Sequence, residues 1–72
     1  MNNQTTKIYS LGRKIFKTRR ECGYSQNKLA EILDISREHL AKIETAKRTV
    51  SLDLLINIAD ALNVKVGDLI DF

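Results

Sequence analysis

Three side chains that make strong hydrogen bonds fall at helical spacing near the middle of the chain: Arg37, Glu38 and Lys42. Arginine and lysine donate hydrogen bonds, whereas an ionised glutamate accepts them. Because Leu40 and Ile43 supply the apolar face of the same segment, we expect the three polar side chains to lie together on its exposed face. Such a face can recognise a partner rich in donors and acceptors. The alternative interpretation is an ordinary solvated helix face.

Residues for catalysis or metal binding are scarce. Cys22 is the only cysteine and His39 the only histidine, which falls short of a structural zinc site. No nucleophile with a matching base and no glycine-rich phosphate loop can be assembled. The sequence therefore predicts no enzyme, no metal and no other cofactor. Cys22 lies on the apolar side of a predicted helix, where we expect a packed core thiol.

Apolar residues at helical spacing predict the elements that position these side chains. The expected helices cover approximately residues 8–22, 25–33, 36–44, 51–63 and a short or irregular segment within 64–72. The three middle helices each open with a residue well suited to N-capping: Ser25, Ser36 and Ser51. Because no alternating segment is long enough to build a sheet, the sequence predicts an all-α fold of five short helices around one core.

Length and composition set further bounds. A chain of 72 residues with 43% hydrophobic and 29% charged residues is typical of one small globular domain, which we place at residues 1–72 with a flexible segment at 1–7. No apolar run approaches the roughly 20 residues of a membrane span, and the N-terminus does not resemble a signal peptide. We therefore expect a cytoplasmic protein.

The charge is unevenly distributed along the chain. Residues 1–28 carry seven basic side chains and one acidic one, a net charge of +6, whereas residues 49–72 carry one basic and four acidic ones, a net charge of −3. Residues 29–48 are neutral overall, with four of each sign. A basic front and an acidic back would orient the molecule toward a polyanion, although a mixed solvated surface is the alternative.

The second and third predicted helices are short and separated by only a few residues near Asp34. A pair joined by so tight a turn holds its second helix at a steep angle to the first, so that the second helix projects from the core. The major groove of B-DNA is about 12 Å wide and admits one helix, while the first helix of the pair can cross the phosphate backbone. One longer helix could not do both.

The motifs LGRKI, SQNKLAEILDIS, HLAKIE, AKRTVS and LLINIADALNV follow one another in register over about residues 11–70. In this order they resemble the helix-turn-helix family that includes the lambda-type phage repressors and Cro proteins. The resemblance implies the lambda repressor-like DNA-binding fold, double-stranded DNA as partner, and contacts to base edges from the third helix. On the matching positions these contacts would come from Arg37, Glu38 and Lys42, with His39 as a neighbour. The chemistry agrees, because arginine and lysine donate to guanine O6 and N7 and glutamate accepts from the cytosine amino group.

The resemblance also implies contacts to DNA phosphates. Gln26 would open the second helix against the backbone with help from Lys28, and the loop after the third helix would add Thr45, Lys47 and Arg48.

Arg19 and Glu44 match a pair that forms a structural salt bridge in relatives. A charge on the apolar stripe of the first helix requires such a partner, because an unpaired buried charge is very costly.

Three positions depart from the family pattern. Asp34 stands where many members have glycine in the turn, and aspartate tolerates the left-handed conformation needed there. Ala46 replaces the glycine that commonly ends the third helix, so we expect this helix to run longer or the loop to take another path. Val50 replaces a common proline, which loosens the loop without abolishing the cap that follows.

A core this small gains from a second copy, and the apolar end of the chain suggests the interface: Leu69, Ile70 and Phe72. The leading hypothesis is a sequence-specific transcriptional regulator, a repressor, that binds an inverted-repeat operator as a homodimer. The alternative is a protein-interaction module or antitoxin-like partner that uses the same fold.

Overall fold

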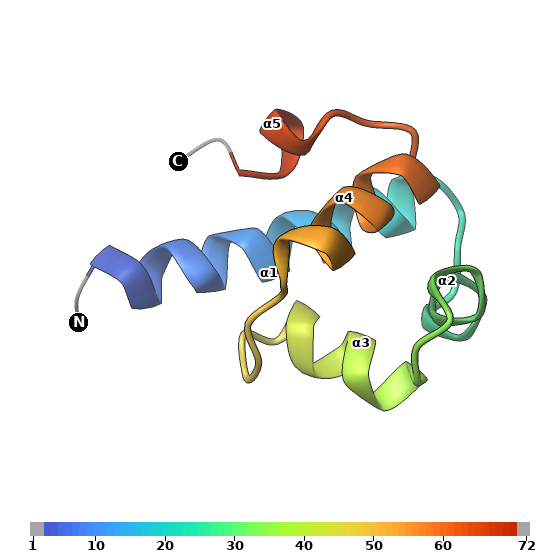
Figure 1. The fold of residues 1–72 in the computed structure, drawn as a ribbon, viewed down its shortest axis with the longest axis horizontal. Coiled ribbons are helices and arrows are strands. Elements are labelled where there is room, and N and C mark those ends of the chain that lie inside the picture. Colours follow the sequence, from blue (N-terminus) through green and yellow to red (C-terminus); the bar gives the residue numbers. More distant parts are fainter. Residues whose placement is uncertain (1–2, 71–72) are drawn as a thin grey trace.

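The computed structural model describes residues 3–70, with side chains from residue 6 onward, and contains helices but no strand within that range (Figure 1). The helices are α1 (Asn3–Glu21), α2 (Gln26–Leu33), α3 (Arg37–Glu44), α4 (Leu52–Ala61) and α5 (Val66–Leu69). The prediction of an all-α fold with five helices around one core is confirmed. Within residues 3–70, no helix is both long and apolar enough to cross a membrane.

Serine N-caps begin the three middle helices as predicted. The Ser25, Ser36 and Ser51 hydroxyls accept hydrogen bonds from the backbone N–H three residues on, over 3.0, 3.0 and 3.2 Å. Each bond satisfies one of the N–H groups that a helix start leaves without a partner. The starts of α2, α3 and α4 are therefore fixed locally, by the sequence itself.

The ends of the first four helices share one geometry. Each is followed by a residue with positive φ: Gly23 (80°), Asp34 (58°), Ala46 (61°) and Asn63 (57°). The N–H of the next residue then donates to the carbonyl five positions back, over 2.8–3.2 Å, which is the Schellman arrangement. The expectation that Ala46 would lengthen the third helix or divert the loop was wrong. Ala46 adopts the left-handed conformation that glycine would supply, and α3 ends at Glu44.

The longest helix is α1, which starts at Asn3 and not near residue 8 as predicted. Of the segment predicted to be flexible, residues 1 and 2 lie outside the described residues, and residues 3–7 belong to α1. Gly12 lets α1 cross the C-terminal end of α3, because a Cβ added there would lie 2.6 Å from the Ile43 carbonyl oxygen. This close approach sets the distance between the first helix and the third.

Ten buried apolar side chains from all five helices form the core. They are Ile15, Leu29, Ala30, Leu40, Ile43, Leu55, Ile58, Ala59, Leu62 and Leu69. Two of the sequence-based expectations fail here. Leu69 is 1% exposed in the single chain, so it belongs to the core and has almost no surface left for a dimer contact. Cys22 is exposed, with its Sγ 3.5 Å from the Leu62 carbonyl oxygen, and is not a packed core thiol.

Candidate nucleic-acid interface

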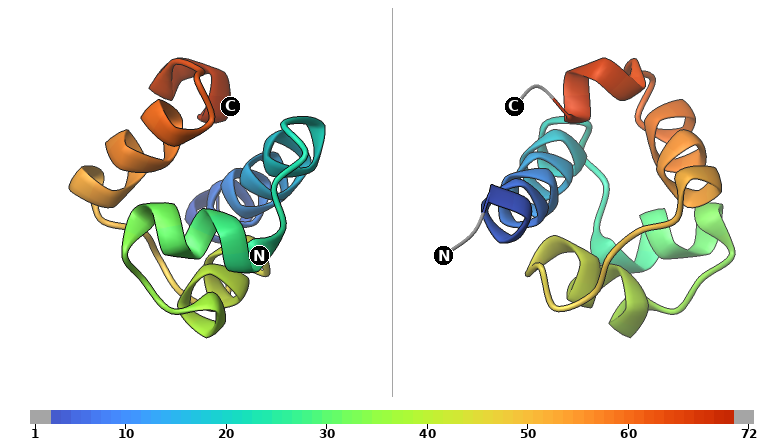
Figure 2. Two further views of the ribbon diagram at one scale, coloured as in Figure 1. Left: turned by 90° about the vertical axis from the view of Figure 1, so that its right-hand side faces the viewer. Right: turned by 60° about the vertical axis from the view of Figure 1, so that its left-hand side comes forward.

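The two short helices α2 and α3 form one unit at the edge of the molecule opposite α5 (Figures 1 and 2). Only residues 34–36 separate them, and Asp34 makes the turn in the left-handed conformation that was predicted for it. Leu29 on α2 and Leu40 on α3 are both fully buried, so the pair is anchored to the core from one side. The opposite side of α3 is left free to project.

The exposed face of α3 carries the side chains that the sequence singled out. Arg37, Glu38 and Lys42 are exposed, whereas His39 is half-buried. Arg37 Nη1 lies 3.4 Å from Gln26 Oε1, which is the side-chain partner that the structure gives Arg37 within residues 6–70. The face therefore presents two cations and one carboxylate to the surroundings from a helix held at both ends by caps.

A buried ion pair joins this unit to α1. Arg19 and Glu44 are 6% and 5% exposed, with Arg19 Nε 2.7 Å from Glu44 Oε2 and Nη2 3.0 Å from Oε1. The third guanidinium nitrogen donates to the Tyr24 carbonyl oxygen over 2.8 Å. The structure thus contains the salt bridge that the family resemblance implies. Its two-pronged geometry is the arrangement in which a buried pair is best compensated for lost hydration.

Gln26 extends the ion pair into a chain of polar contacts. Its Nε2 donates to Glu44 Oε1 over 2.9 Å, and its Oε1 faces Arg37. The path Arg19–Glu44–Gln26–Arg37 therefore runs from the core to the exposed face of α3. A side-chain amide has two N–H donors, so one remains for a phosphate at the start of α2.

The side chains predicted to contact phosphate differ in the hydrogen bonds and ion pairs that they already make within the chain. Thr45 donates its hydroxyl proton to the Ala41 carbonyl oxygen over 2.8 Å, so it has no donor left to offer. Lys28 Nζ lies 3.6 Å from Glu31 in an exposed pair, which is worth little. Lys47 and Arg48 are exposed, and the described part of the chain gives neither an ionic partner.

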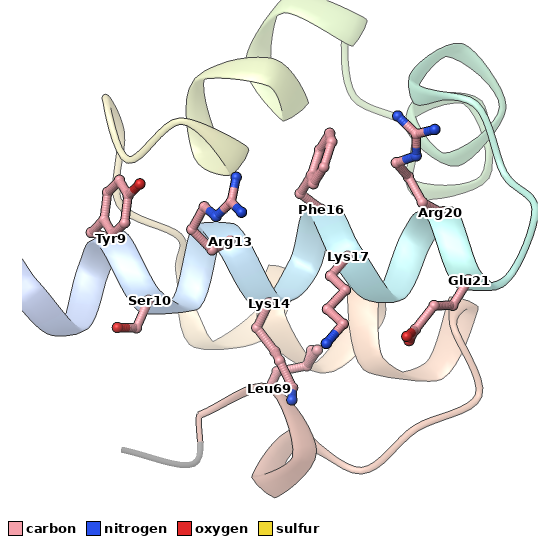
Figure 3. Close-up of a pocket in the computed structure, with 9 residues that line it drawn as sticks. All are labelled: Tyr9, Ser10, Arg13, Lys14, Phe16, Lys17, Arg20, Glu21 and Leu69. Atoms are coloured by element: carbon pink, nitrogen blue, oxygen red, sulfur yellow. The ribbon is translucent and has the colours of Figure 1, made fainter.

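Sequence reasoning missed a second polar surface, on α1. Tyr9, Arg13, Phe16 and Arg20 lie along the side of α1 that faces α2 and the end of α3 (Figure 3). They line a groove of about 810 Å³ together with residues on the α5 side of the same helix. Their spacing of four, three and four residues was a readable signal, since it places all four on one helix face.

A helix-turn-helix family model matches residues 15–69, which include all of α2, α3 and α4. The chain belongs to the helix-turn-helix family, in its lambda repressor-like branch. An uncharacterised helix-turn-helix transcriptional regulator of Rickettsia conorii is 38% identical over 53 residues, or 74% of this chain and 42% of its own length. The control protein C.BamHI of Bacillus amyloliquefaciens is 46% identical over 48 residues, or 67% of this chain and 59% of its own length.

Solved structures agree with this family membership. The restriction-modification controller protein C.AhdI from Aeromonas hydrophila superposes with a TM-score of 0.88 at 25% identity, covering 94% of this chain and 99% of that one. The clp gene regulator ClgR from Corynebacterium glutamicum superposes with a TM-score of 0.86 at 28% identity, covering 89% of this chain and 82% of that one.

Family membership has two consequences for the site. The relatives and solved structures named above are a transcriptional regulator, a gene regulator and control proteins of this helix-turn-helix family. All residues predicted to contact bases or phosphates fall inside the matched range, whereas Tyr9 and Arg13 precede it. The N-terminal half of the α1 surface therefore lies outside the family match, whereas Phe16 and Arg20 lie within it.

Proposed function

We propose that this chain is a sequence-specific transcriptional regulator that reads bases with the exposed face of α3. The carrying observation is that Arg37, Glu38 and Lys42 project from a helix whose other face is fixed in the core. A helix of this kind enters the major groove, where arginine and lysine donate to guanine and glutamate accepts from cytosine. His39, half-buried, is placed to contribute only at the edge of this face.

Phosphate contacts flank the base-reading helix in this proposal. Lys47 and Arg48 supply charge from the loop after α3, and Gln26 with the free N–H groups at the start of α2 supplies neutral donors. Because Thr45 already donates within the chain, we assign it no phosphate contact through its hydroxyl proton. Lys28 adds positive charge near the DNA backbone but is assigned no hydrogen bond to a particular phosphate.

The regulator acts as a homodimer on an inverted repeat in this proposal, with half-sites about 34 Å apart on one side of the duplex. Repression follows from binding alone, because an occupied promoter is closed to polymerase. It would act in the cytoplasm, on the nucleoid. The likeness to C.AhdI makes the control of restriction-modification genes the biological setting to examine first.

A second candidate function has its own observation. Three apolar side chains on α2 and α4 are exposed, Ile32 by 46%, Leu52 by 68% and Ile56 by 41%. An antitoxin-like or other protein-interaction module would use such a surface to bind a protein partner. In that case the polar face of α3 would be an ordinary solvated face.

Selection of bound duplexes from a random pool at near-physiological salt tests the first proposal. We expect an enriched palindrome bound at least about a thousandfold more tightly than random DNA. Arg37→Ala should cost about 1–3 kcal/mol at one base position and relax the preference there, whereas Lys47→Ala should weaken binding to all duplexes alike. Lys65→Ala, which removes one exposed charge at the start of α5, is the matched control. Enrichment of no sequence would favour the protein-interaction module.

A further inference from the structure

The surface on α1 forms a continuous row beside the helix-turn-helix pair. Tyr9, Arg13, Phe16 and Arg20 succeed one another along one side of the helix, which at 1.5 Å per residue makes a row about 17 Å long. Figure 3 shows the four side chains on the side of α1 toward α2 and the end of α3, and Lys17 on the side toward α5. The α1 row below means these four residues.

The α1 row adjoins residues already assigned to the DNA-facing unit. A cleft of about 260 Å³ is lined from α1 by Tyr9, Arg13 and Phe16, and from the other elements by Gln26, Glu44 and Thr45. Gln26 opens α2, where the proposal places a phosphate, and Thr45 begins the loop that leads from α3 to Lys47. A strand of DNA that passes Gln26 would continue along the α1 row.

The charges of the α1 row are held in place and are not neutralised. The guanidinium carbons of Arg13 and Arg20 lie 5.9 and 5.6 Å from the centre of the Phe16 ring, within the range of cation–π attraction. Arg19 lies 5.2 Å from the same ring, but Glu44 compensates its charge. Within residues 6–70, the structure gives Arg13 and Arg20 no carboxylate partner. Two oriented guanidinium groups are thus free for an external anion.

We infer that the α1 row binds the sugar-phosphate backbone of duplex DNA next to the stretch that α3 reads. Arg13 and Arg20 would each hold one phosphate through paired N–H donors, and the Tyr9 hydroxyl would donate to a further phosphate oxygen. The inference rests on the proposed function and extends it, because Tyr9 and Arg13 precede the residues that the family match covers. The contact would raise affinity for DNA of any sequence and lengthen the protected stretch.

Charge-removing variants on the two sides of α1 test the inference. Arg13→Gln and Arg20→Gln remove charges from the α1 row, whereas Lys17→Gln removes the same charge from the α5 side of the same helix. The probe is the duplex recovered by selection, titrated over a range of salt concentrations and examined by ethylation interference at its phosphates. Each row variant should lower the slope of log K against log salt by about 1, and the double variant by about 2.

Three further results decide the matter. Arg13→Lys should restore most of the slope, because a lysine keeps the charge without the fork. Lys17→Gln should leave the ethylation-interference pattern unchanged. Arg13→Gln should abolish the interference at those phosphates that lie outside the stretch contacted by α3. Thermal unfolding of each variant by circular dichroism checks that the fold is kept.

The opposite outcomes are distinct. If Lys47→Ala lowers the slope while the row variants keep it, the inference is overturned and the proposed function stands. If the row variants bind DNA unchanged but lose self-association in sedimentation, the α1 row is a protein contact and the inference is again overturned. If the unchanged protein binds no duplex above a nonspecific level in the selection and its affinity does not depend on Lys47, both proposals fail together.

Discussion

Glu44 is the residue on which the position of α3 depends most directly. Its carboxylate accepts three hydrogen bonds, two from Arg19 and one from Gln26, and is almost completely buried. Taking such a charge out of water costs several kcal/mol, which only a full set of donors compensates. Because Gln26 bonds Glu44 and also faces Arg37, the buried Arg19–Glu44 pair helps to hold Arg37, which the proposed function uses to contact bases.

Removing one member of the buried pair should therefore be far more damaging than removing an exposed one. We expect Arg19→Met to lower the free energy of unfolding by about 3–5 kcal/mol, since it leaves Glu44 buried without its cation. Lys28→Met breaks the exposed pair with Glu31 and should change stability by less than about 0.5 kcal/mol. Urea unfolding followed by circular dichroism measures both. Equal losses in the two variants would mean that Glu44 regains water when Arg19 is gone.

At the scale of elements, the bounds of the three middle helices could be predicted to within about two residues, whereas the start of α1 could not. The serine caps could be read from the sequence because the side chain and the N–H it accepts from are three residues apart. The predicted segment 36–44 ends where α3 ends, and only the expectation that Ala46 would lengthen this helix was wrong, because Ala46 adopts a positive φ that alanine intrinsically disfavours. The start of α1 was missed because no cap or apolar spacing precedes Ile8.

Ala46 consequently stores strain that a glycine would release. We expect Ala46→Gly to raise the free energy of unfolding by about 1 kcal/mol, because the left-handed conformation costs alanine about 1–2 kcal/mol and glycine regains part of that in chain entropy. Ala41→Gly within α3 is the control and should lower stability by about 1 kcal/mol. Thermal unfolding of the two variants under one buffer compares them. A loss of stability in Ala46→Gly would show that the loop tolerates alanine at no cost.

At the scale of the whole molecule, the sequence located the candidate base-reading face but not what surrounds it. Arg37 and Lys42 could be placed by helical spacing next to buried Leu40 and Ile43. The α1 row could not be recognised from the sequence, because its place in the site depends on a shared cleft with Gln26 and Thr45, which are distant in sequence. Leu69 was taken for an interface residue for the same reason. Local spacing cannot show that α5 folds back over α1 and α4.

Because Leu69 is buried in the core, two of the three proposed interface residues remain as candidates for the dimer contact. These are Ile70, which is 38% exposed, and Phe72, which lies outside the described residues. Two copies can place both α3 helices on one side of a duplex only if the two-fold axis runs beside α3 and not through the far end of the molecule. A dimer contact through Ile70 meets this condition on the two-fold axis only if the two copies pack along the edge of the molecule where α5 contacts α1.

A matched pair of variants separates this interface from its rival. Ile70→Asp and Phe72→Asp should shift the chain toward the monomer in sedimentation velocity and weaken operator binding more than nonspecific binding, because a monomer holds only one half-site. Ile56 on α4 has nearly the same exposure, 41%, so Ile56→Asp introduces the same charge at a comparable apolar site elsewhere and should leave the dimer intact. A monomer produced by Ile56→Asp alone would move the two-fold axis to α4. The spacing of the selected half-sites would then have to follow from that contact.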